Sequence, residues 1–471
     1  MSKPKSPRGL AVNRRTFLKS AVAVTGAAAF PHIWVQQPAY AGTSARGAVK
    51  HLLYIRLGGG FRFTAAFNGE SASQFNPFGL ADRAASGVDW GVGRMLAEAS
   101  WLQGDDGQRR RDAGMRTVPD LANQIAVLPC VDHEPNANRA DGNHGTGLER
   151  YLTGYVGGDT SFFTMINYAL RERAAAIQAE GGIALPAFSL SDAGMSIGHG
   201  RYASFRPPVV QGDGFEGFGF DATSSLPEWA QALSARMDAR ARDRQNPFAR
   251  DQVDAYLQTR EATRSYSSIF NSDVLRIRNN SEEAVDGISN RQLGFLLGDT
   301  RAARHVRLAL RLFGFGSPAC FLNQGYYDMH SGEENGLPRQ MDELNRLISG
   351  LDVALKTMDH PDGGTYWDHT LVVFGSEFGR TAGGNRFNSA RGSDHGGDRA
   401  TRWMSMPFMG GLIDEAGMGG RMIGETDRDD LQARDRVFSY RSVLKTLMDA
   451  LGGDHREFFP GDLPTDALVR G

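Results

Sequence analysis

The sequence has few cysteines and little charge imbalance, and each shortage argues against a class of protein. It has two cysteines in 471 residues, with neither iron–sulfur spacing nor a C-x-x-C-H motif, which disfavours an electron-transfer protein. The formal net charge of −2 provides no electrostatic footprint for nucleic acid. Beyond the N-terminal region, no apolar run approaches the roughly 18 to 20 residues of a membrane span. We therefore expect no stable membrane span in the mature chain.

A dinucleotide-binding fingerprint is also missing. The glycine run 58–60 follows an apolar, strand-like segment, but the G-x-G-x-x-G spacing is absent. No acidic residue follows at the interval that a ribose contact requires. We exclude a nicotinamide cofactor, although these glycines would let a ligand approach the backbone closely.

The N-terminal 41 residues have the order of an export signal. A basic stretch is followed by the apolar run 21–30 and by a small-x-small cleavage site at 39–41. Residues 13–19 read NRRTFLK, which matches the twin-arginine pattern at every position except the first. We predict a twin-arginine signal peptide over 1–41, with the twin-arginine translocase and signal peptidase as partners. The mature protein, 42–471, is expected to be periplasmic or secreted.

Two interpretations are open for the cysteines. Cys130 and Cys320 each lie in an apolar, strand-like run. Export makes a disulfide between them possible, but free cysteines are commonly buried and inert. We favour two buried thiols and keep the disulfide as the alternative.

Short apolar runs bounded by glycine or proline predict buried strands. They lie at 51–57, 125–131, 184–190, 319–323, 371–374 and 406–409. Segments of helical period lie at 164–179, 226–242, 290–313, 337–358 and 440–451. This alternation predicts an α/β fold with a doubly wound, mostly parallel sheet covered by helices on both faces. We interpret 191–290, first a loop and then polar and helical, as an insertion or cap.

Histidine and carboxylate side chains follow several predicted strands. In an open parallel sheet, ligands bind outside the carboxyl ends of the strands. The loop residues there include Asp132, His133, Asn143, His144, Asp328, His330, Glu377, Arg380, Asp394 and His395. Each pair alone is typical of a turn or a surface hydrogen bond. Their convergence on one sheet edge would suit a divalent metal such as zinc, manganese or iron.

Thr146 lies where a glycine-rich turn feeds a short helix. A hydroxyl at a helix N-terminus sits among free backbone N–H groups that favour an anionic group, so Thr146 is a candidate nucleophile. The alternative is that Thr146 caps the helix, with Glu149 completing a capping box.

These motifs resemble a family of twin-arginine-exported proteins catalogued as domain of unknown function 1501 (DUF1501), related to the alkaline phosphatase and sulfatase superfamily. The resemblance rests on the glycine run 58–60, YDMH at 327–330, SEFGRT at 376–381, DHG at 394–396 and GGRMIGE at 419–425. It implies an alkaline-phosphatase-like, sulfatase-like α/β/α sandwich across nearly the whole mature chain.

The resemblance also implies roles for individual residues. The places of metal ligands fall on Asp328, His330, Glu377, Asp394 and His395, with Glu377 a ligand or the residue that orients one. The nucleophile falls near Thr146. Arg380 would clamp the anionic group, because the planar donors of arginine match two phosphate or sulfate oxygens.

One departure from the family divides the functional hypotheses. Related proteins often keep an aspartate after the glycines, whereas this chain has Phe61 and Arg62. Either one metal remains, or Arg62 replaces the metal charge and hydrolysis is lost. The first hypothesis is an exported metal-dependent hydrolase of phosphate or sulfate esters. The alternative is a non-catalytic module that binds an envelope polymer, an anionic ligand or another exported protein, which an ion pair of Arg62 inside the carboxylate cluster would favour.

Overall fold

The computed structural model describes residues 47–133, 143–180, 185–191, 193–210, 228–245, 250, 253–254, 267–270, 272–380, 390–395 and 402–460. The predicted signal peptide over 1–41 and much of the predicted insertion over 191–290 lie outside these ranges, and both assignments stay predictions. None of the described helices combines the length and apolar character needed to cross a bilayer.

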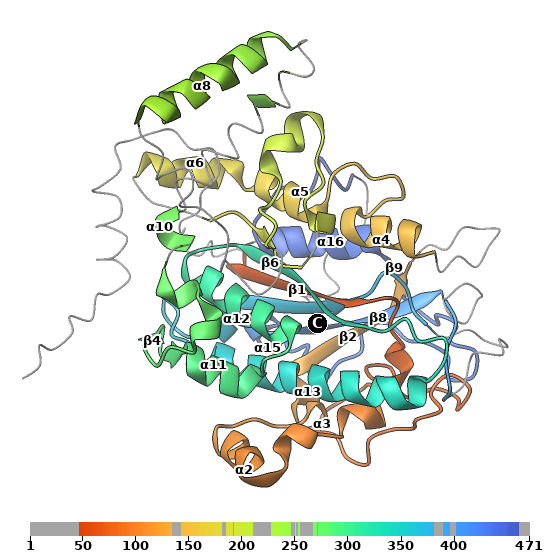
Figure 1. Cartoon of the computed structure of the whole chain (residues 1–471). Helices are drawn as coiled ribbons and strands as arrows, with labels where there is room; N and C mark the ends of the chain where they lie inside the picture. The colour runs from red at the N-terminus through yellow and green to blue at the C-terminus, as the bar shows by residue number, and fades with distance from the viewer. Residues whose placement is uncertain are drawn as a thin grey trace, which may run out of the picture.

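A seven-stranded sheet forms the centre of the molecule (Figure 1). In spatial order its strands are β3 (Phe188–Ser189), β6 (Ala319–Tyr326), β1 (His51–Gly58), β7 (Thr370–Gly375), β8 (Trp403–Met409), β2 (Ile125–Asp132) and β9 (Phe438–Ser439). β1 pairs in parallel with β6 and β7, whereas β8 runs antiparallel to β7 and β2. The prediction of a mostly parallel sheet is therefore confirmed.

The central strands lack a polar face. All six residues of β7 are buried, as are seven of the eight residues of β1, where Arg56 is the exception. A strand covered on both faces needs apolar side chains in succession rather than in alternation. This requirement explains why short continuous apolar runs located the strands in the sequence.

Helices cover both faces of the sheet (Figure 1). One face carries α4 (His144–Thr153), α5 (Phe162–Ala169), α6 (Arg171–Ala179) and α16 (Tyr440–Ala450). The other carries α11 (Asn290–Leu297), α12 (Arg301–Gly314), α13 (Glu333–Thr357) and α15 (Gly411–Glu415). The remaining elements are α2 (Gly104–Asp112), α3 (Val118–Leu121), α8 (Glu228–Asp243), α10 (Ser267–Phe270), α14 (Tyr366–His369) and a hairpin of β4 (Ala284–Val285) and β5 (Ile288–Ser289).

Two predicted helices are each divided in the structure. The segment predicted at 290–313 ends as α11 at Gly298, which adopts φ 93°, and restarts as α12 after Thr300. The Thr300 hydroxyl accepts a hydrogen bond from the Ala303 N–H and so caps the second helix. The segment predicted at 164–179 is likewise divided at Leu170, between α5 and α6. Hydrophobic periodicity continued across both breaks and concealed them.

The two cysteines are buried and free, so the favoured interpretation is confirmed and the disulfide is wrong. Cys130 lies on β2 and Cys320 on β6. Three strands separate β2 from β6, which places them about 19 Å apart at the usual strand spacing. A disulfide requires Cα atoms within about 7 Å.

We expect both thiols to be inert in the native protein. Burial raises the pKa of the Cys130 thiol to about 12, which suppresses the thiolate that reacts. Native protein should not react with a thiol reagent at pH 8, whereas two thiols should react after unfolding in denaturant without reductant. Fewer than two reactive thiols in the unfolded chain would contradict the arrangement.

Candidate functional site

The carboxyl ends of the parallel strands bring the predicted metal ligands to one edge of the sheet. Asp328 and His330 follow β6, Glu377 follows β7, and Asp394 and His395 precede β8, whose antiparallel direction starts it at the same edge. His144 opens α4 and reaches the same place. The sheet topology therefore assembles the site from segments distant in the sequence.

Asp328 and three imidazoles form the centre of the cluster. Asp328 Oδ1 lies 3.2 Å from His330 Nε2 and 3.2 Å from His395 Nε2, and the two imidazole nitrogens are 3.0 Å apart. His144 Nε2 lies 3.2 Å from Asp328 Oδ2. Tetrahedral zinc with bonds of about 2.0–2.1 Å places its ligand atoms roughly 3.3 Å apart. Asp328 Oδ1, His330 Nε2 and His395 Nε2 have nearly this spacing, whereas His144 faces the other oxygen of Asp328.

His144 is a candidate ligand that the sequence assignments missed. The sequence places it after a predicted strand, but the predicted set of ligands does not include it. Ligand atoms of His144, Asp328 and His395 all lie within 4.8 Å of one another. His144 Nε2 is buried and has no hydrogen-bond partner among the described residues, although it lies 3.2 Å from Asp328 Oδ2. A buried nitrogen facing a carboxylate and a second imidazole fits a metal ligand.

Glu377 is committed to neighbouring groups rather than open to the cluster. Its fully buried carboxylate accepts hydrogen bonds from Arg56 Nε at 3.1 Å, Arg56 Nη2 at 2.9 Å and the Gly59 N–H at 2.8 Å. His144 Nδ1 lies 3.5 Å from the same carboxylate. Of the two roles predicted for Glu377, these contacts favour orienting a ligand. A proton on His144 Nδ1, facing Glu377, leaves Nε2 free for a metal.

The charges around Glu377 shift the pKa values of both partners. Burial alone would raise the pKa of Glu377, but hydrogen bonds from His144 and Arg56 outweigh it and hold the pKa far below its usual range. The hydrogen bond to Glu377 in turn raises the pKa of His144, against the effect of burial. Glu377 is therefore an anion at any physiological pH.

Arg380 joins three segments beneath the cluster. Its guanidinium is fully buried and donates to Asp328 Oδ1 at 2.5 Å, to the Gly59 carbonyl at 3.3 Å and to the Ser393 carbonyl at 2.8 Å. Burial opposes ionisation of Asp328, but Arg380, the Tyr326 hydroxyl and the imidazoles lower its pKa overall. The predicted role of Arg380 as a clamp for a substrate anion stays a prediction. The contacts favour a role in positioning Asp328.

Arg62 pairs with Glu333, so the described residues do not show the ion pair inside the carboxylate cluster that the binding hypothesis expects. Its Nη1 donates to Glu333 Oε2 at 2.9 Å, and both side chains are buried. Glu333 Oε1 accepts from the Ser393 hydroxyl at 3.2 Å. The cation beside Asp328 is Arg380. A buried guanidinium needs a carboxylate partner, and Glu333 at the start of α13 is the partner of Arg62.

Thr146 lies in the first turn of α4 but does not cap the helix. The cap is Asn143, whose side chain accepts from the Gly145 N–H at 2.8 Å and the Thr146 N–H at 3.4 Å. Glu149 accepts from the Gly157 N–H, so the capping-box alternative is wrong. Thr146 Oγ1 is buried with no hydrogen-bond partner among the described residues. An unpartnered hydroxyl at this place is available for chemistry.

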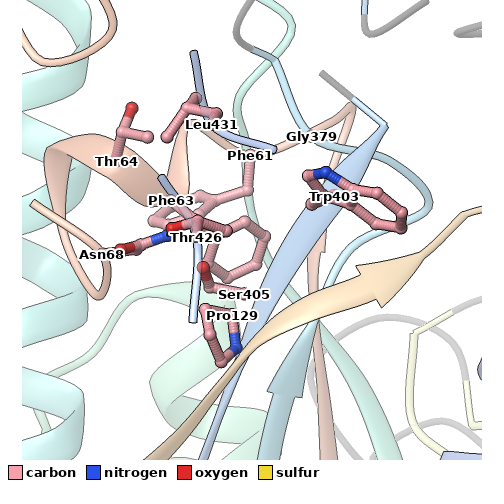
Figure 2. Close-up of a pocket in the computed structure, with 10 residues that line it drawn as sticks. All are labelled: Phe61, Phe63, Thr64, Asn68, Pro129, Gly379, Trp403, Ser405, Thr426 and Leu431. Carbon is pink, nitrogen blue, oxygen red and sulfur yellow. Dashed lines mark hydrogen bonds between the residues drawn. The ribbon is translucent and has the colours of Figure 1, made fainter. Parts of the chain in front are cut away.

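A small pocket lies beside the site and contains none of the predicted site residues (Figure 2). Phe61, Phe63, Leu431 and Trp403 supply much of its wall, and its space, partly open to solvent, is about 320 Å³. Phe61 and Gly379, which pair beyond the ends of β1 and β7, belong to this wall. The pocket therefore lies next to the segments that carry Arg62 and Arg380.

The buried pair of Arg62 and Glu333 should control how stability depends on pH. Burial raises the pKa of Glu333 from 4.5 to about 7, despite the opposing effect of Arg62. The folded state therefore binds the proton more tightly than the unfolded state. The free energy of unfolding should fall as the pH rises from about 4.5 to about 7, and Glu333→Gln should remove this fall in chemical denaturation.

A second pair of variants checks the same contact. Arg62→Met leaves a buried carboxylate unpaired and should cost about 3–5 kcal/mol at pH 8, whereas Arg62→Met with Glu333→Met should recover most of that loss. The cost of the single change should shrink toward pH 5, where the carboxyl is protonated. Equal stabilities of single and double variants at pH 8 would contradict the pairing.

Comparison with known structures shows weak likenesses. The integral membrane protein lipooligosaccharide phosphoethanolamine transferase A (EptA) from Neisseria meningitidis aligns with a TM-score of 0.34 and 10% identity, over 93% of this chain and 60% of that one. The soluble domain of the same transferase aligns with a TM-score of 0.33 and 10% identity, over 94% of this chain and 99% of that domain. The C-terminal periplasmic domain of EcEptC from Escherichia coli aligns with a TM-score of 0.31 and 9% identity, over 94% of this chain and 90% of that domain. TM-scores this low give no basis for inferring the activity of this protein.

Sequence comparison identifies the family. No curated protein matches the chain. The family model described as "Protein of unknown function (DUF1501)" matches residues 97–466, which is most of the chain. The protein belongs to the DUF1501 family.

Proposed function

We propose that the protein is an exported hydrolase of phosphate or sulfate esters that uses one divalent metal ion. The observation that carries the proposal is the convergence of Asp328 with His144, His330 and His395 on one sheet edge. Three imidazoles and a carboxylate are a donor set used for zinc. The export part of the proposal rests on the twin-arginine segment over 1–41.

The surroundings of the cluster support one metal rather than two. Glu377, the carboxylate available after β7, is neutralised by the two hydrogen bonds from Arg56. After β1, the chain offers Phe61 and Arg62 instead of a carboxylate, and Arg62 is paired with Glu333. The guanidinium of Arg56 thus balances the charge of Glu377, which a second metal ion would otherwise balance.

Each chain group has a role in the proposed hydrolysis. A bound metal would supply Lewis-acid neutralisation of the ester oxygens and lower the pKa of a hydroxyl or water beside it. The Thr146 oxygen would attack phosphorus or sulfur, the alcohol would leave with a proton, and water would then hydrolyse the Thr146 ester. Glu377 and Asp394, which lies 3.5 Å from His330 Nδ1, would orient the histidines.

A non-catalytic binding module is the second candidate, and one contact favours it. Arg380 Nη1 lies 2.5 Å from Asp328 Oδ1, the oxygen that also faces His330 and His395. This guanidinium competes with a metal for the oxygen. In that case the edge would bind an anionic ligand or envelope polymer with a degenerate metal site, and the metal measurement below separates the two candidates.

Metal content is the first test. Protein exported by its own signal should contain about one equivalent of a divalent metal by elemental mass spectrometry. His395→Ala should lose it, because it removes a nitrogen 3.2 Å from Asp328. Metal-free wild-type protein that cannot be reconstituted would leave the binding module as the function.

Two further variants make the metal measurement specific. His199→Ala removes an exposed histidine outside the cluster and should retain the metal. Glu377→Gln should weaken metal affinity roughly 10- to 100-fold, as losses of orienting partners do, without abolishing binding. Equal loss in all three variants would indicate general damage rather than a metal site.

The Thr146 hydroxyl should be required for turnover but not for metal. Thr146→Val keeps the shape and should lower hydrolysis of an aryl phosphate or aryl sulfate by roughly three orders of magnitude or more, with metal content unchanged. Thr146→Ser keeps the nucleophilic oxygen and should retain part of the activity. Full activity of Thr146→Val would exclude Thr146 as the nucleophile.

A further inference from the structure

α8 carries large apolar side chains on its outer side. Trp229, Leu233 and Met237 are 69%, 44% and 62% exposed, and Figure 1 shows α8 beyond α6 at the outer limit of the molecule. Their spacing of four residues places them within an arc of about 80° on one face. Contiguous exposed apolar side chains of this size indicate an interaction surface.

The polarity of α8 is inverted with respect to an ordinary surface helix. Among the residues of α8 whose burial is described, Ala230, Ser234 and Asp238, on a neighbouring face, are the partly buried ones. A surface helix normally buries its large apolar residues and exposes the small and charged ones. Packing within the described part of the chain therefore does not account for Trp229 and Met237.

Arginines lie among the apolar residues of the same face. Arg236 and Arg240 are exposed, and their positions fall within about 20° of Trp229 around the helix. Arg244 continues the row just after α8, where its N–H bonds to the Arg240 carbonyl. Within the described ranges, neither Arg236 nor Arg240 forms an ion pair. The outer face thus combines an indole, a leucine and a methionine with three arginines, Arg236, Arg240 and Arg244, against one exposed carboxylate, Asp243, so its charge is net positive.

We propose that the outer face of α8, defined by Trp229, Leu233, Met237, Arg236 and Arg240, docks on an anionic lipid bilayer. Tryptophan and arginine are suited to the headgroup boundary, where the indole ring is partly buried and the guanidinium meets phosphate. The apolar row spans only about 12 Å, which is too small for a stable protein interface of about 800 Å² per partner. The bilayer requires no such area, and the proposal holds with or without a metal at the sheet edge.

The test is sedimentation of the exported protein with vesicles. Vesicles of phosphatidylcholine with 30% phosphatidylglycerol should bind the protein at 0.1 M salt, and pure phosphatidylcholine vesicles should not. Binding should weaken as salt rises to 1 M. Arg236→Gln with Arg240→Gln should lower the partition coefficient about fivefold for each arginine. Trp229→Ser with Met237→Ser should also lower it.

A charge-matched control isolates α8. Arg83→Gln with Arg301→Gln removes two exposed arginines elsewhere and should leave vesicle binding close to wild type. All proteins share one N-terminus, so any contribution of residues 1–41 cancels in the comparison. Unchanged urea midpoints would show that the variants remain folded. The proposal is overturned if wild-type protein does not bind anionic vesicles or binds both vesicle types equally. It is also overturned if Arg83→Gln with Arg301→Gln loses as much binding as the α8 variants.

Discussion

The buried guanidinium of Arg380 is the constraint on which the candidate site depends. It contacts the segment after β1 at Gly59, the segment after β6 at Asp328 and the segment before β8 at Ser393. A cation without solvent must be surrounded by acceptors, so these three segments have little freedom to move apart. The position of Asp328, and with it the convergence of the imidazoles, follows from this requirement.

Three arginines near the site each have a carboxylate partner, and the pairing decides what charge remains. Arg56 neutralises Glu377, Arg62 pairs with Glu333, and Arg380 pairs with Asp328. The first two pairs commit Glu377 and Arg62 to partners of opposite charge. The third leaves Asp328 shared between a guanidinium and the imidazoles. This competition is the electrostatic question that separates a hydrolase from a binding module.

Close backbone approach explains one feature of the glycine run. Gly59 adopts φ 93°, and a Cβ atom there would lie 2.8 Å from the backbone nitrogen of Asp328. The same residue donates its N–H to Glu377. The sequence predicted that a ligand could approach these glycines. At Gly59 the space is instead filled by the protein, because the segments after β1, β6 and β7 pack against one another.

Local sequence determined six strands of the central sheet, the longer helices, and the placement of Asp328 and His330 after a buried strand and of His395 before one, because apolar continuity and helical period are local properties. The tertiary structure alone decided that His144 joins them, that Glu377 and Asp394 stand behind histidines, and that Arg380 rather than Arg62 faces Asp328. Those outcomes depend on which carboxylate lies within reach of each histidine and each buried arginine. That is a matter of distance between segments hundreds of residues apart, which no local pattern records.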